Sequence, residues 1–164
     1  MVEQKDDKNG TQPLAIDFGI LVGLAYQGFT DQLWVVLAAK GFSDLGNAYG
    51  YVFRALADQA LSQRALALRL GITDQGMAKI LAEMVARGYV ERGADPGDAR
   101  IKRLRLGKRG RLALAAARRF HADFERSLIK EAGANTVATL RRALELIARR
   151  GHDGDLAQAR LRAM

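Results

Sequence analysis

The sequence contains no cysteine and only two prolines in 164 residues. Without cysteine there can be no disulfide framework, thiolate nucleophile, cysteine-ligated zinc site or thiol redox sensor. A chain of this kind fits a reducing compartment, and we expect a cytoplasmic protein. The scarcity of proline and an apolar fraction of 49% argue against disorder. We expect one globular domain with a proper core, because the length is short for two.

Patterns that carry catalysis or metal binding are also missing. The two histidines, His121 and His152, lie far apart, with no metal-ligand spacing near either. The glycines of residues 71–76 lack the lysine and serine that a phosphate-binding loop requires, and there is no hydrolase serine elbow. His121 shares a helical face with Phe124 and Leu128, which favours a core or interface histidine. We predict a protein that is not an enzyme and that needs no metal or cofactor.

Long uncharged apolar runs are missing as well, and we expect no segment to span a bilayer and no membrane partner. The first ten residues mix acidic and basic side chains, which argues against a signal peptide. We expect residues 1–13 to form a flexible arm, residues 14–150 to form one domain, and residues 151–164 to form a tail.

The net charge of +8 is concentrated in the middle of the sequence. Residues 60–119 carry fourteen Lys/Arg against five Asp/Glu, a net charge of +9, whereas residues 1–59 have a net charge of −3. Such a local excess is typical of a protein that binds a polyanion. A solvated basic face without function would give the same count, so the charge alone does not decide.

The same basic segment has the pattern of a helix-turn-helix. Ser62 is placed to cap a short helix that Gly71 ends, and Thr73 is placed to cap a second helix that runs to about Arg87. Apolar residues at helical spacing define the buried stripe of this second helix: Met77, Ile80, Leu81 and Met84. The residues that then face outward are Gln75, Gly76, Lys79, Ala82 and Glu83.

Strands and longer helices are predicted on either side of this pair. Period-two alternation predicts strands at residues 89–92 and 101–106, and a long helix follows from residue 108 to about 131, with a last helix after it. Before the pair, we expect helices at about 14–40 and 44–58. The terminal helices show more apolar faces than a thin helix-turn-helix can cover. We therefore expect them to pack on each other within and between two copies, in a two-fold dimer.

These features resemble the MarR family of winged helix-turn-helix transcriptional regulators, over about residues 14 to 150. The likeness is most specific in the wing, the loop and strand pair that follow the second helix. Two positions depart from the family: Ala99 stands where another basic residue is frequent, and Gly107 where a threonine usually caps the next helix. The stretches that carry the resemblance are Leu61-Ser62-Gln63, Leu66-Ala67, Leu70-Gly71-Ile72, Met77, Ile80-Leu81, Met84, Arg87-Gly88-Tyr89-Val90, Asp95-Pro96-Gly97-Asp98-Ala99-Arg100, Leu104, Leu106 and Gly110.

The resemblance implies a mainly α fold with a small β-wing. A reading head at about residues 61–107 would be flanked by dimerisation helices at about 14–40 and 108–150. The homodimer would bind a pseudo-palindromic operator in double-stranded DNA. The resemblance further implies a repressor whose DNA affinity is lowered by a small aromatic or anionic effector.

The predicted DNA contacts lie on the second helix, at the start of the first, and in the wing. Gln75 can pair with adenine, and Lys79 can reach guanine or a phosphate. Arg100 is predicted to enter the groove with Asp98 orienting its guanidinium group. Gly76 either allows the backbone to approach DNA closely or is a tolerated glycine. The full set of predicted contact residues is Ser62, Gln63, Asp74, Gln75, Gly76, Lys79, Asp98, Arg100, Lys102 and Arg103.

The aromatic residues of the first two predicted helices have two interpretations. They form the core, or they line an effector pocket as the resemblance implies; the candidate lining residues are Tyr26, Trp34, Tyr49 and Phe53. A different functional class is a dimeric winged-helix module that holds a protein partner and has little DNA specificity. The exposed positions predicted for Lys79, Arg100 and Arg103 argue against that class.

Overall fold

The computed structural model describes residues 16–94 and 102–150. Within these ranges the chain is mainly helical and carries one antiparallel strand pair. The elements in chain order are α1 (Phe18–Ala39), α2 (Tyr49–Leu56), α3 (Gln63–Leu70), α4 (Asp74–Ala86), β1 (Val90–Ala94), β2 (Lys102–Leu106), α5 (Lys108–Ala132) and α6 (Ala134–Arg150). This confirms the predicted class, a mainly α fold with a small β-wing.

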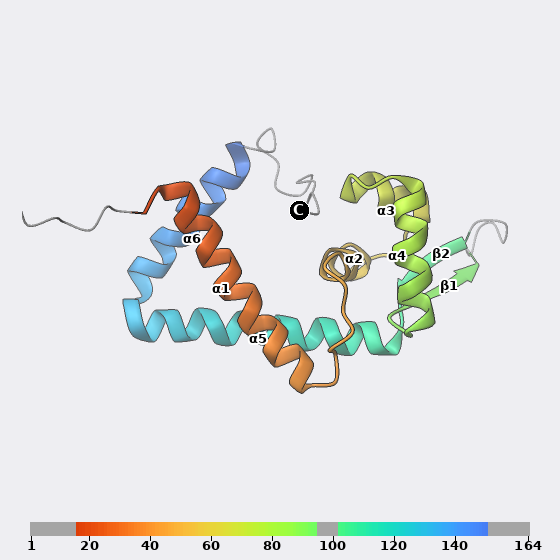
Figure 1. Cartoon of the computed structure of the whole chain (residues 1–164), viewed down its shortest axis with the longest axis horizontal. Coiled ribbons are helices and arrows are strands. Elements are labelled where there is room, and N and C mark those ends of the chain that lie inside the picture. Colours follow the sequence, from red (N-terminus) through yellow and green to blue (C-terminus); the bar gives the residue numbers. More distant parts are fainter. Residues whose placement is uncertain (1–15, 95–101, 151–164) are drawn as a thin grey trace, which may run out of the picture.

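Helix α5 is the long axis of the molecule. Figure 1 shows it running from the strand pair at one end to α6 at the other, with α1 crossing it. Helices α1, α2 and α6 all pack against α5. The strand pair therefore lies at one end of α5, and α6 lies at its other end.

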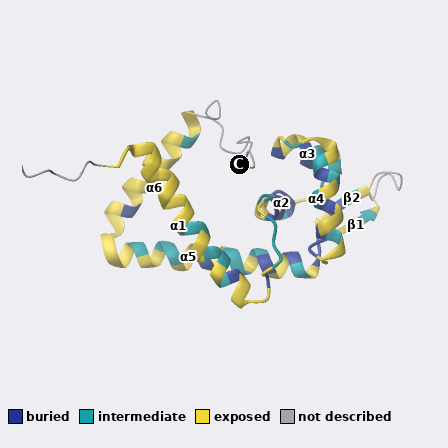
Figure 2. Cartoon of the chain, viewed as in Figure 1, coloured by how far each residue is buried: buried dark blue, intermediate teal, exposed yellow. Residues whose placement is uncertain are grey.

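The buried core lies in and beside the reading head. Figure 2 shows buried residues gathered around α2, α3 and α4, while α1 and α6 are mostly exposed. The side chains of Tyr89, Leu66 and Val52 are fully buried there, together with the inner stripe of α4. Burial of these apolar side chains is what holds the short helices together, because helices of eight residues are marginal by themselves.

The helix pair α3 and α4 forms as its local signals predict. The Oγ of Ser62 accepts a hydrogen bond from the amide of Ala65, and the Oγ1 of Thr73 accepts one from the amide of Gly76. Each bond satisfies an amide that the first helical turn leaves without a partner. Between the helices, Gly71 has φ +64°, a left-handed conformation that glycine adopts without strain. The predicted caps and turn are confirmed.

The wing strands pair in a fixed antiparallel register. Val90 lies opposite Leu106 and Ala94 lies opposite Lys102. Leu61 adds an isolated bridge to β2: its backbone amide donates to the carbonyl of Leu104, and its carbonyl accepts a hydrogen bond from the amide of Leu104. The segment before α3 is therefore hydrogen-bonded to the wing. This contact fixes the start of α3 relative to β2.

The prediction that the second helix begins near residue 44 is wrong. Helix α2 begins at Tyr49, its N-cap is Ala48, and no side chain caps it. The carboxylate of Asp44 accepts hydrogen bonds from Tyr89 and Arg109 instead of from a helical first turn. The carboxylate of Asp44 is thus occupied by partners that are remote in sequence.

Helix α1 corrects the prediction about apolar runs. It spans 22 residues with a mean hydropathy of 1.3, enough by length and composition to cross a bilayer. Asp31 is the one charged residue between Phe18 and Ala39. The glycines of α1 do not exclude a membrane helix, because glycine is frequent in such helices. The side chains of α1 are largely exposed in the isolated chain (Figure 2).

Candidate nucleic-acid interface

Helix α4 presents one polar face to solvent and buries the other. The side chains of Met77, Leu81 and Met84 are fully buried against the core. Gln75 and Lys79 lie on the exposed face, as predicted. Because the buried stripe fixes the rotation of the helix about its axis, these two polar side chains are held facing outward. Ile80, predicted as part of the stripe, is half-buried.

The surroundings of Gly76 leave little room for a side chain. A Cβ at this position would lie 3.1 Å from both the Oγ1 of Thr73 and the Cγ2 of Ile72. These distances are tighter than ordinary van der Waals contact, so a larger residue would press on the Thr73 cap. This steric reason stands beside the two interpretations given above, close approach to DNA and a tolerated glycine.

The start of α3 is tied to the start of α4. The side-chain amide of Gln63 donates to the backbone carbonyl of Asp74 at 3.4 Å. Ser62 and Gln63 are half-buried, and Asp74 is exposed at the first turn of α4. The amino ends of both helices therefore lie side by side, which is the geometry needed for one surface to face one phosphate backbone.

The predicted wing contacts are described only in part. Asp98 and Arg100 lie outside the described residues. Lys102 begins β2 and is exposed, as a phosphate contact requires. Arg103 is half-buried and donates to the carbonyl of Ala60 at 3.3 Å. That hydrogen bond gives Arg103 a structural role in addition to its predicted one.

The four aromatic residues proposed for an effector pocket lie in different surroundings. Tyr49 and Phe53 are buried in the core, with ring centroids 6.3 Å apart. Trp34 is half-buried and packs against the same core. Tyr26 is exposed on α1, where its hydroxyl lies 3.3 Å from that of Tyr51. An effector site lined by all four is not tested by these positions and stays a prediction.

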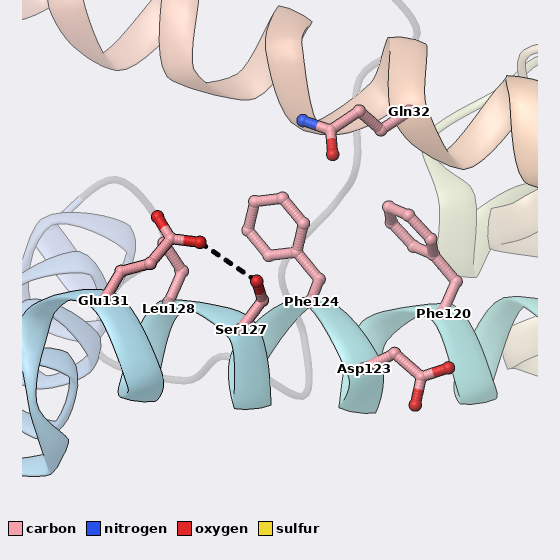
Figure 3. Close-up of a pocket in the computed structure, with 7 residues that line it drawn as sticks. All are labelled: Gln32, Phe120, Asp123, Phe124, Ser127, Leu128 and Glu131. Atoms are coloured by element: carbon pink, nitrogen blue, oxygen red, sulfur yellow. Dashed lines mark hydrogen bonds between the residues drawn. The ribbon is translucent and has the colours of Figure 1, made fainter.

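A pocket of about 390 Å³ lies where α1 and α5 diverge. Figure 3 shows Phe120 and Phe124 pointing from α5 toward Gln32 on α1, while Asp123 points away. The Oγ of Ser127 donates to the carboxylate of Glu131 at the rim. The remaining lining residue is Leu128. The pocket thus combines an aromatic floor with a negatively charged edge.

His121 belongs to the aromatic cluster beside this pocket. Its ring centroid lies 5.0 Å from that of Phe29, which also contacts Phe120 and Phe124. Burial and, secondarily, the positive charge of Arg54 lower the pKa of His121 below its usual value. The prediction of a core or interface histidine stays a prediction. Among the described residues, no group of three or more His, Cys, Asp or Glu is placed to hold a metal ion.

Four residues at the base of the reading head form a joint that the sequence did not reveal: Asp44, Arg87, Tyr89 and Arg109. The guanidinium of Arg109 donates to both carboxylate oxygens of Asp44, at 2.8 and 3.0 Å. The hydroxyl of Tyr89 donates to the Oδ1 of Asp44 at 2.5 Å. Arg87 donates to the backbone carbonyl of Asp44. These partners lie 43 to 65 positions apart in the chain, so no local spacing could have indicated them.

The capped helix pair, the strand pair beside it and the exposed polar face of α4 define a winged helix-turn-helix protein. Residues 43–101 match the profile of the MarR family. This part of the chain is therefore similar to the MarR family, whose members are transcription regulators.

A curated relative and two solved structures illustrate the likeness. The exopolysaccharide II synthesis transcriptional activator ExpG of Rhizobium meliloti is 28% identical over 125 residues, which are 75% of this chain and 64% of that protein. This chain therefore spans less than two thirds of that relative. The transcriptional repressor CouR, bound to a 23-mer DNA duplex, is 27% identical with a TM-score of 0.63, over 80% of this chain and 92% of the other.

A second solved structure shares the fold over a longer stretch. Streptococcus pneumoniae FabT, in complex with DNA, is 20% identical with a TM-score of 0.67. The match covers 85% of this chain and all of the other. The likeness in fold therefore extends beyond the helix-turn-helix to most of the chain.

Proposed function

We propose that this protein is a homodimeric, sequence-specific DNA-binding transcription regulator. The observation that carries the proposal is the exposed face of α4, on which Gln75 and Lys79 are held outward by the fully buried Met77, Leu81 and Met84. An amide and an ammonium group on a rigid helix can read base edges in a major groove. The net charge of +9 over residues 60–119 supplies attraction to the phosphate backbone.

Dimerisation is supported by apolar surface that the single chain leaves exposed. Large apolar side chains on α1 and α6 are between 36% and 70% exposed. Apolar surface of this extent on a soluble protein usually marks an interface. The residues are Phe18, Ile20, Leu21, Val22, Leu24 and Val35 on α1, and Leu140, Leu144, Leu146 and Ile147 on α6. A two-fold dimer through these helices presents two copies of α4 to one face of a duplex.

Repression relieved by a small molecule is the regulatory part of the proposal. CouR is a repressor and ExpG an activator, so these relatives favour neither repression nor activation. Of the two kinds of effector, the pocket between α1 and α5 suits an aromatic one. Phe120 and Phe124 offer apolar rings, and the carboxylate of Glu131 disfavours an anion. A cytoplasmic location belongs to the same proposal.

The test begins with selection of duplexes from a random library, followed by titration of the selected duplex at several salt concentrations. We expect sequence preference and a log–log salt slope that steepens by about one unit for each phosphate contact. Arg100→Ala should weaken binding to all duplexes, and Gln75→Ala should change the preferred sequence. Binding without sequence preference and without a salt slope would refute the proposal. A protein partner captured from nuclease-treated extract would then favour the interaction-module alternative.

A further inference from the structure

The joint at the base of the reading head connects three segments through one guanidinium group. Arg109, the second residue of α5, donates to the carboxylate of Asp44, to the carbonyl of Gly41 and to the carbonyl of Arg87. Asp44 and Gly41 belong to the loop after α1, and Arg87 caps the carboxyl end of α4. Arg109 also stacks over the ring of Tyr89, 4.5 Å from its centroid. One side chain therefore holds α4 to the dimerisation helix α5.

The backbone of α5 approaches this joint unusually closely. The amide of Gly107 donates to the carbonyl of Tyr89 at 2.9 Å. A Cβ at Gly107 would lie 2.5 Å from the carbonyl oxygen of Gly88, and a Cβ at Gly110 would overlap the carbonyl of Tyr89. The turn that ends α4 thus packs directly on the first turn of α5, with no side chain between them.

A small tilt of α4 at the joint displaces the opposite end of the helix. Twelve residues separate Gln75 from Arg87, a distance of roughly 18 Å along an α-helix. A tilt of about 10° at the joint therefore moves the side chain of Gln75 by roughly 3 Å. That displacement is close to the rise of about 3.4 Å between base pairs. Small changes at the joint would change which base pair Gln75 faces.

We infer that Asp44 and Arg109 are positioning residues that set the orientation of α4 relative to α5, and thereby the half-site separation that the dimer accepts. The inference rests on the proposed function. Neither residue needs to touch DNA: the ion pair is bidentate, which fixes direction as well as distance. A single hydrogen bond would leave the guanidinium group free to rotate. The guanidinium of Arg109 is held by three partners: the carboxylate of Asp44 and the carbonyls of Gly41 and Arg87.

The test uses a selected palindromic duplex and two derivatives whose half-site separation is one base pair shorter or longer. Wild-type protein should lose about tenfold or more in affinity on either derivative. Arg109→Lys keeps the charge but loses the planar fork. Asp44→Asn removes one negative charge, which by electrostatics alone would tighten binding to every duplex. In both variants we expect the affinity for the two derivatives to be less than about threefold below the affinity for the selected duplex.

The matched control is the exposed ion pair between Asp123 and Arg126 on the same helix. Asp123→Asn and Arg126→Lys make the same chemical changes away from the joint and should keep the wild-type spacing preference. The double variant Asp44→Asn/Arg109→Lys should be no worse than either single variant, because the two residues act through each other. If Asp44→Asn fails to fold, Tyr89→Phe removes one hydrogen bond from the same carboxylate without a change of charge.

Folded dimers of the joint variants that keep the wild-type spacing preference would overturn the inference alone. So would an equal loss of affinity on all three duplexes, since that is the result of a general loss of stability. A wild-type protein that selects no duplex would overturn the proposed function, and this inference with it. The inference is supported if the joint variants lose the preference for one half-site separation and the Asp123 and Arg126 variants keep it.

Discussion

Gly107 and Gly88 meet without any side chain between them, at the point where α5 begins beside the end of α4. A Cβ on Gly107 would lie 2.5 Å from the carbonyl oxygen of Gly88. The sequence shows only that glycine replaces the threonine that usually caps this helix in the family. The structure supplies the reason: the two turns are too close for a larger residue.

Gly107→Thr should therefore destabilise the protein, although threonine is a good helix cap. We expect a gain of a few tenths of a kcal/mol from the cap and a larger loss, of about 1–3 kcal/mol, from the steric overlap. Urea unfolding followed by circular dichroism measures the difference. Gly50→Ala on α2 is the control, since a Cβ there meets nothing within 4 Å and should add about 0.5–1 kcal/mol. A Gly107→Thr protein as stable as wild type would contradict the close approach.

Tyr89 should make the protein sensitive to alkaline pH. Burial, and then the hydrogen bond to Asp44, raise the pKa of Tyr89 to about 12. Because the folded value lies above the unfolded one, this contribution to stability is complete below about pH 10 and is lost as the pH rises toward 12. In Tyr89→Phe, the fall in unfolding free energy between pH 9 and 11.5 should be smaller, by up to about 2 kcal/mol.

A second tyrosine contributes to the same alkaline range and must be separated from the first. The hydrogen bond with Tyr26, followed by burial, raises the pKa of Tyr51 to about 12. Tyr51→Phe should remove the part of the alkaline decrease in unfolding free energy that Tyr51 causes. Tyr51→Phe/Tyr89→Phe should remove the parts that both tyrosines cause. The assignment to Tyr89 fails if the single variant Tyr89→Phe follows the wild-type curve over this range.

His121 should reduce the stability of the folded protein at acidic pH. Its pKa is lowered by burial and by Arg54, so the neutral ring is favoured in the folded protein. Its contribution to stability is present above the usual histidine pKa and is lost as the pH falls through the lower, folded value. His121→Gln should show a smaller decrease in Tm between pH 7.5 and pH 5 than wild type. Arg54→Gln should also reduce that decrease, because it removes a like charge, whereas an unchanged Tm difference in both variants would contradict the assignment.

Leu144 tests the dimer that the exposed faces of α1 and α6 support. Its side chain is 46% exposed in the single chain. A charge buried in an apolar interface is unfavourable, and Leu144→Arg should shift the protein toward monomer. Light scattering coupled to size-exclusion chromatography measures the mass. Leu68→Arg is the control, since Leu68 is 66% exposed on α3 in the reading head; equal masses for both variants would argue against an interface at α6.

The helix-turn-helix could be predicted because its signals are local. Ser62 and Thr73 cap helices through amides three residues away, and Gly71 adopts the left-handed turn between them. The rotation of α4 follows from the spacing of Met77, Leu81 and Met84, which the structure buries as predicted. The outward position of Gln75 and Lys79 was therefore available from the sequence. The start of α2 was not, because the carboxylate of Asp44 binds partners far along the chain.

The aromatic residues show the same division. Spacing placed Tyr49 and Phe53 on a helix but could not distinguish a core position from the wall of a pocket, because both demand an apolar face. In the structure both rings are buried and pack against Tyr89. The apolar run of α1 was underestimated: Asp31 is its one charged residue, and its mean hydropathy is 1.3 over 22 residues.

The sequence by itself determined the identity of the reading head, its caps, its buried stripe and its positive charge, since each depends on residues within one or two helical turns. Tertiary structure alone decided how that reading head is attached to α5. The attachment depends on Asp44, Tyr89 and Arg109, which meet only after the chain has folded. Contacts between remote residues have no spacing rule, and the close backbone approach at Gly107 is visible only when both turns are in place.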